Sequence, residues 1–235
     1  DPLPDIDFNI RCGNTLVGYA TAQDLENDLN YGDMFAKEEF LDKVHSEMDK
    51  VAYTYDAFKK VQLEQNADLE TYRNAKKELK ERLKKLDDLL NKKLFASTVS
   101  GGAKYDDWLK SHQPFHWLAE YYDIINGNGG FDVIIGNPPY VEYNKRVQGV
   151  AVSDIYKLYG YKTIDCGNLY AYCIERGTAI INRQARVGWI VPISVICTER
   201  TKSVQNFLRN EYNRYISSFD IFPAKLFEGA AQRVS

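Results

Sequence analysis

The stretch "FDVIIGNPPYVEY", residues 131–143, is an apolar run that ends abruptly at two prolines. Phe, Val and Ile favour a pleated strand, and an uninterrupted apolar run is typical of a strand buried in a parallel sheet. Proline has no N–H to donate, so the two prolines end the strand. The sequence therefore predicts that Asn-Pro-Pro-Tyr, residues 137–140, lies at the carboxyl end of a buried strand, where parallel α/β sheets bind their ligands.

The residues that follow alternate between helical and strand patterns. Residues 168–181 and 203–212 have helical spacing, whereas 187–192 and 215–222 are short apolar runs typical of strands. Residues 141–166 are polar and predict a loop. This rhythm predicts a parallel α/β sheet, with one more short strand expected at 5–18.

Residues 33–100 contain neither glycine nor proline. Apolar residues recur there at alternating spacings of three and four, which predicts two helices with one apolar seam each. The seam residues are Leu41, Val44, Met48, Val51, Tyr55 and Phe58 in the first helix, and Leu79, Leu83, Leu86 and Leu90 in the second. The polar break between them, with Asn66 as the expected N-cap, predicts an antiparallel helical hairpin. We expect a structural or oligomerisation arm, with an arm that touches DNA or another domain as the alternative.

Composition excludes several classes of protein. The net charge of −3 comes from 30 basic and 33 acidic residues, so the overall charge does not indicate a nucleic-acid-binding surface. No apolar run reaches the length of about 18 residues that a membrane helix needs, and no signal peptide is recognisable, so we expect a cytoplasmic protein without a membrane partner. His112 and His116 flank Pro114, which argues against one helix face presenting both, and no metal site is expected.

The Asn-Pro-Pro-Tyr segment suits chemistry on a planar nitrogen. The lone pair of a base's exocyclic amine is delocalised into the ring, so the amine is a poor nucleophile. Two acceptors aimed at its N–H groups favour a tetrahedral nitrogen, and the side-chain oxygen of Asn137 and the carbonyl of Pro138 are such acceptors. Tyr140 offers a face on which a base stacks, once that base has been flipped out of a duplex. A glutamine amide has the same delocalised lone pair, so it stays a candidate substrate beside a base.

Together these motifs resemble the γ-class N6-adenine DNA methyltransferases, in particular the methylase polypeptides of type II and fused restriction–modification systems. The resemblance is carried by "GGFDVIIGNPPYV", by "GNLYAYCIERGTAII" followed by "VGWIVPISV", by "KLFEGAAQRVS" and by "NIRCGNTL". It implies an α/β fold: a partial Rossmann-like sheet of an S-adenosylmethionine-dependent methyltransferase, with residues 1–32 and 101–235 as the catalytic core. Residues 33–100 would be an inserted antiparallel helical hairpin.

The resemblance also implies an activity and a site. The activity is transfer of a methyl group from S-adenosylmethionine to N6 of an adenine flipped out of double-stranded DNA, within a restriction–modification system. The implied catalytic residues are Asn137, Pro138 and Tyr140. Tyr140 and Phe227 would stack on the adenine. The residues at the cofactor would be Asn14, Asn137 and Pro139. The glycine-rich cofactor loop is expected before residue 1, and a specificity or nuclease domain outside this chain. We therefore expect a piece of a catalytic domain that is inactive alone.

Three other functions stay open. A glutamine N5 protein methyltransferase and an RNA base methyltransferase would use the same pair of acceptors. A non-catalytic DNA-binding or assembly subunit that retains the fold is the third, because no glycine-rich cofactor loop is recognisable in residues 1–235.

Overall fold

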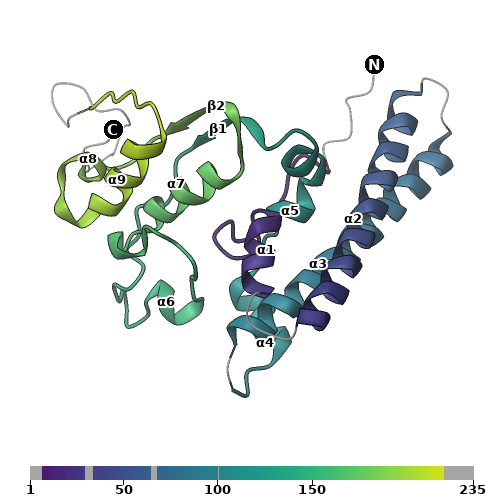
Figure 1. Cartoon of the computed structure of the whole chain (residues 1–235), viewed down its shortest axis with the longest axis horizontal. Helices are drawn as coiled ribbons and strands as arrows, with labels where there is room; N and C mark the ends of the chain where they lie inside the picture. Colours follow the sequence, from purple (N-terminus) through teal and green to yellow (C-terminus); the bar gives the residue numbers. More distant parts are fainter. Residues whose placement is uncertain (1–6, 30–33, 65–67, 100, 220–235) are drawn as a thin grey trace. The chain divides into compact units, whose positions relative to one another are not determined.

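The computed structural model describes residues 7–29, 34–64, 68–99 and 101–219. These residues form a mixed α/β structure that divides into two compact units, Asp1–Gly129 and Gly130–Ser235. The first unit is helical, and the second contains a small parallel sheet (Figure 1). The prediction that residues 33–100 are an insertion in a catalytic core is not tested by this division and stays a prediction.

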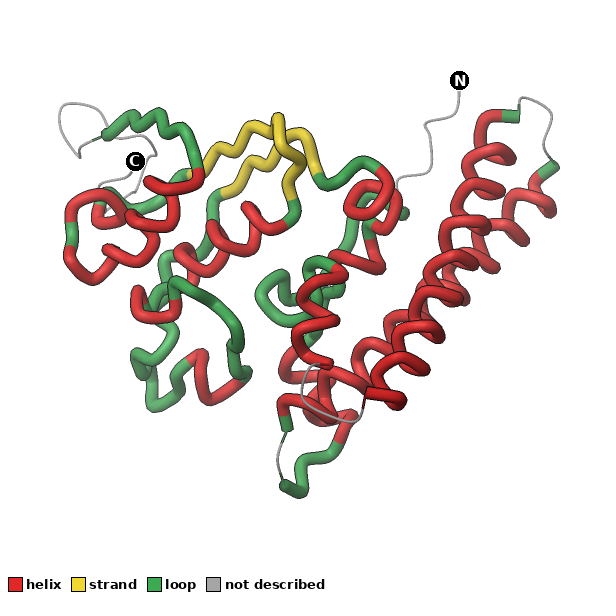
Figure 2. Tube along the Cα trace, viewed as in Figure 1, coloured by secondary structure: helices red, strands yellow, loops and turns green. Residues whose placement is uncertain are grey.

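Two long helices, α2 (Met34–Leu63) and α3 (Leu69–Thr98), pack along each other in the first unit (Figure 2). Phe58 of α2 lies against Tyr72 near the start of α3, with ring centroids 5.6 Å apart, so the two helices run antiparallel. The predicted seam faces inward, and its buried members are Val44, Met48, Val51, Phe58, Leu79, Leu83, Leu86 and Leu90. Burial of this seam stabilises the two helices, because tertiary packing of an apolar face supplies most of the stability of helices in proteins.

The start of α3 is set by Asp68. Its side chain accepts a hydrogen bond from the Thr71 N–H at 2.6 Å and another from the Thr71 hydroxyl at 2.9 Å. The prediction of Asn66 as the N-cap is therefore wrong, because the acidic side chain next to the first helical residue takes that role. Asn66 itself lies outside the described residues.

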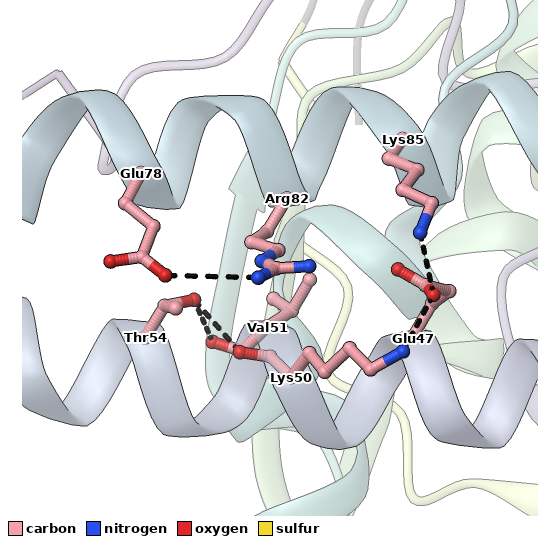
Figure 3. A network of polar contacts seen from close by, with 7 residues as sticks. All are labelled: Glu47, Lys50, Val51, Thr54, Glu78, Arg82 and Lys85. Carbon is pink, nitrogen blue, oxygen red and sulfur yellow. Dashed lines mark hydrogen bonds and ion pairs between the residues drawn. The ribbon is translucent and has the colours of Figure 1, made fainter.

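A buried carboxylate lies at the contact between the two long helices (Figure 3). Glu47 of α2 is 6% exposed and pairs with Lys50 of its own helix and with Lys85 of α3, both at 2.9 Å. The hydrogen bond from Lys50, followed by that from Lys85, lowers the pKa of the Glu47 carboxyl group. A shift of one helix along the other would leave this charge buried and unpaired, which is costly, so the pair helps to fix the register.

Residues 7–18 do not form the strand predicted at 5–18, and residues 5–6 lie outside the described part. Residues 7–18 form turns, with Asn14 as a single bridge residue, and α1 (Ala22–Leu29) follows. The Asn14 N–H donates to the Gln113 carbonyl at 2.7 Å, so this segment is held by isolated bonds rather than by a ladder. Gly18, at φ +120°, passes so close to Phe115 that a Cβ would lie 2.7 Å from its carbonyl carbon.

Short helices complete the first unit: α4 (Tyr105–His112), α5 (Trp117–Glu120) and the π-helix η1 (Asp123–Gly127). His116 is fully buried, its Nδ1 accepting from the Tyr19 N–H and its Nε2 lying 3.1 Å from Oδ1 of Asn91. Because Nδ1 accepts, the ring proton sits on Nε2 and donates to Asn91. The Asn91 amide in turn donates to Asp87 at 2.9 Å.

Asp87 makes stability depend on pH. Burial raises the pKa of Asp87 to about 7, the Glu120 charge adds to this, and the Asn91 hydrogen bond opposes it. In the unfolded chain the group ionises near its ordinary pKa of about 3.9. Between about pH 4 and pH 7 the folded state therefore binds more protons, and the free energy of unfolding falls as the pH rises. We expect Asp87→Asn to stabilise the protein above about pH 7 and to change little below about pH 4.

Urea unfolding at the two pH values measures this difference. The matched control is Asp56→Asn, a change of an exposed carboxylate on α2, from which we expect no comparable gain in stability. A gain in stability of equal size at both pH values would contradict the assignment to Asp87.

The second unit contains two parallel strands, β1 (Phe131–Gly136) and β2 (Ile181–Trp189), connected through α7 (Leu169–Ala179). β2 begins earlier than the predicted strand 187–192, because Ile181 and Arg186 also pair with residues of β1. The register shifts between Phe131 and Val133, and from there the opposed pairs are Val133–Arg186, Ile134–Val187, Ile135–Gly188 and Gly136–Trp189.

β1 is the more exposed of the two strands in its apolar side chains. Ile135 is 83% exposed and Val133 is 56% exposed. Within the described ranges β1 pairs with β2 alone, so its other edge presents unpaired backbone groups. Parallel strands are ordinarily buried on both faces, whereas no residue of β1 is buried in the described structure, so the prediction of a buried strand is wrong for these residues.

The rest of the second unit is built from short helices. They are α6 (Val152–Ile155), η2 (Ile164–Cys166), α8 (Ser194–Cys197), η3 (Glu199–Thr201) and α9 (Lys202–Glu211). α9 confirms the helix predicted at 203–212. The strand predicted at 215–222 is not formed by residues 215–218, which are irregular, and residues 220–222 lie outside the described part.

Candidate functional site

Asn137 stands directly after the last residue of β1, as predicted. It is exposed, Pro138 behind it is buried, Pro139 is exposed, and Tyr140 is partly buried. The buried ring of Pro138 anchors the turn, while the lack of a proline N–H ends the pairing with β2. The side chain of Asn137 is thus presented at the carboxyl end of the sheet.

The Tyr140 hydroxyl joins the ends of the two strands. It lies 3.0 Å from Oδ1 of Asn137 and 3.0 Å from the carbonyl oxygen of Ile190, the residue after β2. One hydroxyl proton serves both acceptors. The Ile190 N–H donates to the Gly136 carbonyl at 3.0 Å, so residues 136–140 are tied to the end of β2 through backbone and side chain.

The ring of Tyr140 has one aromatic neighbour in the described chain. Tyr170 of α7 meets it edge to face, with centroids 6.5 Å apart and planes at 88°. Burial raises the pKa of the Tyr140 hydroxyl, which keeps it a donor at neutral pH. Tyr170 is 3% exposed and its hydroxyl lies 3.4 Å from Oγ of Ser194, so it supports Tyr140 from a fixed position.

The segment after Tyr140 is folded rather than an open loop. Tyr143 is 6% exposed, its hydroxyl donates to the Tyr156 carbonyl at 3.0 Å and accepts from the Leu158 N–H at 2.9 Å. Glu175 of α7 accepts three hydrogen bonds, from the backbone N–H groups of Lys162 and Thr163 and from the Thr163 hydroxyl. The hydrogen bonds of Tyr143 and Glu175 thus hold in place a polar segment that has little apolar patterning of its own.

Glu175 is expected to be the main support of this segment. Glu175→Gln replaces a charged acceptor of three bonds by an amide, and bonds to charged groups are worth about 1.5–3 kcal/mol. We expect a loss of stability of that size, and faster hydrogen exchange at the Lys162 and Thr163 amides. Glu199→Gln is the matched control, because that side chain is 90% exposed and its ion pair among the described residues is with Lys202, at 3.4 Å. Unchanged exchange at residues 162–163 would contradict the role given to Glu175.

Two predicted site residues, Asn14 and Phe227, do not belong to the segment 137–140. Asn14 belongs to the first unit, where its Oδ1 accepts from the Leu16 N–H at 3.2 Å. Its amide nitrogen donates to no atom of the described residues. Phe227, the predicted second stacking residue, lies outside the described residues. The structure therefore brings together Asn137 and Tyr140.

Several neighbours of the site were not predicted from the sequence. Ile190 accepts from Tyr140, Tyr170 meets its ring, and Trp189 lies opposite Gly136 in the sheet. Gly136, directly before Asn137, could have indicated a close neighbour such as Trp189, because a glycine in a strand often marks the close approach of another group.

Other classes of site find no support in the described ranges. They contain no group of three His, Cys, Asp or Glu side chains placed to hold a metal ion. His116 has both ring nitrogens engaged in hydrogen bonds. No helix of the described residues has the length and hydropathy that spanning a membrane requires.

Comparison with known proteins places this site in a family. A family model described as Eco57I restriction-modification methylase matches residues 23–227. RM.Eco57I, a type II restriction enzyme and methyltransferase of Escherichia coli, is 30% identical over 133 residues, covering 55% of this chain and 13% of that protein. RM.MjaORFECS2P, a putative type II restriction enzyme and methyltransferase of Methanocaldococcus jannaschii, is 25% identical over 228 residues, covering 82% of this chain and 19% of that protein.

This chain thus spans a fifth or less of the length of these curated relatives. No solved structure matches it. The family model covers most of the chain and includes the whole segment from Asn137 to Tyr140. The chain therefore belongs to the Eco57I restriction-modification methylase family.

Proposed function

We propose that this chain is part of a DNA methyltransferase that transfers a methyl group from S-adenosylmethionine to N6 of an adenine flipped out of double-stranded DNA, within a restriction–modification system. The observation that carries the proposal is the exposed Asn137 at the carboxyl end of β1, held by the Tyr140 hydroxyl, in a chain of a restriction-modification methylase family. The names of both relatives join a restriction enzyme to a methyltransferase, which supports a nuclease or specificity domain elsewhere in the full-length protein.

The side chains at the strand end fit the two ligands of such a reaction. Asn137 and Pro139 are exposed, so both are open to a cofactor and to a target base. S-adenosylmethionine, when bound, supplies a methyl group activated by a sulfonium. Asn14 is the third proposed cofactor contact, through the amide nitrogen that is not used within the described residues.

The residues of this chain would act by holding the target amine. Oδ1 of Asn137 and the carbonyl of Pro138 accept its two N–H groups, which localises the nitrogen lone pair for in-line attack. N6 would take up the methyl group that S-adenosylmethionine supplies and would release one proton to solvent. When Oδ1 accepts from the amine, the Tyr140 hydroxyl keeps the Ile190 carbonyl as its acceptor. Tyr140 and Phe227 would hold the base between their rings.

The fold proposal that accompanies this function is a Rossmann-like sheet larger than β1 and β2. The open edge of β1 and the exposure of Ile135 support it, because a buried parallel strand needs further neighbours. In the same proposal α2 and α3 are an inserted hairpin, since their apolar residues pack on each other.

The experiment is methyl transfer from labelled S-adenosylmethionine by the full-length protein. Plasmid DNA, total RNA and a glutamine-containing protein substrate are offered in parallel, and the product is identified by mass spectrometry of nucleosides or peptides. We expect label in N6-methyladenine of DNA, at one sequence context. Label in RNA or at a glutamine, or none in any substrate, would overturn the proposal in favour of the corresponding alternative.

A further inference from the structure

The last residue of β1 is packed against an indole. Gly136 lies opposite Trp189 in the sheet, and a Cβ built on Gly136 would lie 2.8 Å from Cε3 of that ring and nearer still to Cζ3. Gly177 of α7 meets the same ring from the helix, where a Cβ would lie 2.5 Å from Cζ2 and 3.1 Å from Cη2. The six-membered part of the indole therefore fills a slot with a glycine on each of two elements.

This slot stands directly behind the candidate site. Asn137 follows Gly136 in the chain, and Ile190, which accepts from the Tyr140 hydroxyl, follows Trp189. A backbone that is in van der Waals contact with a rigid ring has little freedom to rotate or translate. The position of the indole thus sets where the chain leaves β1 and where the Ile190 carbonyl stands.

The buried N–H of the Trp189 indole argues against the view that this side chain only fills space. Its Nε1–H is buried and has no hydrogen-bond partner in the described ranges. A buried donor without an acceptor loses hydration without compensation, so a phenylalanine would avoid that cost. What the indole adds is the reach of its outer ring, which contacts both glycines.

We propose that Trp189 is a positioning residue: its indole, seated between Gly136 and Gly177, fixes the direction in which Asn137 leaves β1. The inference rests on the proposed function, because it assigns to Trp189 the alignment of the group that would hold the target amine. The reaction is sensitive to such alignment, since a misplacement of about 1 Å by a distant change can cost about 100-fold in rate.

The test uses a change on α7, away from the strand end. Gly177→Ala in the full-length protein pushes a methyl group into the indole, and we expect kcat for DNA methylation to fall about 10-fold to 100-fold with little change in KM for DNA. Trp189→Phe removes the outer ring and makes room for that methyl. The double variant is therefore expected to be no slower than Trp189→Phe alone.

Gly188→Ala is the matched control, because nothing lies within 4 Å of a Cβ built there. Thermal unfolding of every variant separates loss of folded protein from loss of rate. A fall in stability with kcat of the folded enzyme unchanged, or independent effects of Gly177→Ala and Trp189→Phe, would overturn the positioning role.

A crystal structure of the Gly177→Ala full-length protein shows the position of the indole and of Asn137 without an activity assay. We expect the indole displaced and the bond between Tyr140 and Asn137 lost. If the wild-type protein methylates no DNA but this displacement is seen, the proposed function fails while the mechanical coupling stands. If Asn137 keeps its place although the indole moves, the inference fails whatever the enzyme does.

Discussion

Replacing Asn137 by alanine in the full-length protein is expected to slow DNA methylation by about 100-fold to 1000-fold, the loss found when one preorganised hydrogen bond to a reacting group is removed. The reason is its position: Oδ1 is the proposed acceptor for the amine, and the side chain is exposed at the strand end. The folded structure should change little, because the Tyr140 hydroxyl keeps the Ile190 carbonyl as acceptor. Single-turnover methyl transfer and thermal unfolding measure the two effects.

Asn144→Ala is the control for this prediction. It makes the same chemical change at another exposed asparagine of the second unit, a few residues beyond the strand end. We expect wild-type turnover from Asn144→Ala. Wild-type turnover from Asn137→Ala would refute the proposed role of that amide, and a loss of folding equal to the loss of rate would reduce Asn137 to a structural residue.

The second large effect concerns the contact between the long helices. Leu86 of α3 is fully buried in the seam with α2, so Leu86→Ala removes packed methyl groups and leaves a cavity. Such changes cost about 2–5 kcal/mol. We expect a lower denaturation midpoint in urea, followed by far-UV circular dichroism, because these two helices hold much of the helical structure of the first unit.

Leu69→Ala is the paired control on the same helix. Leu69 is the first residue of α3 and is 73% exposed, so its truncation removes little buried area. Its effect should stay within about 0.5 kcal/mol. Equal destabilisation by the two changes would contradict the assignment of Leu86 to the core between the helices.

Local periodicity explains what could be predicted of the fold. The seams of α2 and α3 repeat over several turns, and the buried apolar residues of the two helices belong to the repeat. Residues 7–18 do not form the expected strand, and the close approach of Gly18 to Phe115 in this segment is a contact that no local pattern contains. The Asn66 cap was wrong for a smaller reason, since two residues of capping type stand close together and only Asp68 adjoins the helix.

The candidate site also has one part that could be predicted from the sequence and another that could not. Asn137 and Tyr140 are near neighbours in sequence, so their shared place at a strand end followed from the apolar run and the prolines. Ile190 and Trp189 join them from about fifty positions away, through the pairing of β1 with β2, which only the fold establishes. The stacking role of Phe227 stays a prediction, because that residue lies outside the described part.

The open edge of β1 has a consequence for anyone who prepares this chain by itself. Within the described residues β1 pairs with β2 alone and has Val133 and Ile135 exposed, so its second edge is a template on which another copy can add its own strand. Aggregation in concentrated samples would then begin at β1, while the rest of each molecule stays folded. Ile135→Lys would place a charge on this strand and so oppose the addition of a strand from a second copy. The same charge would oppose pairing with the neighbouring strand of a larger sheet.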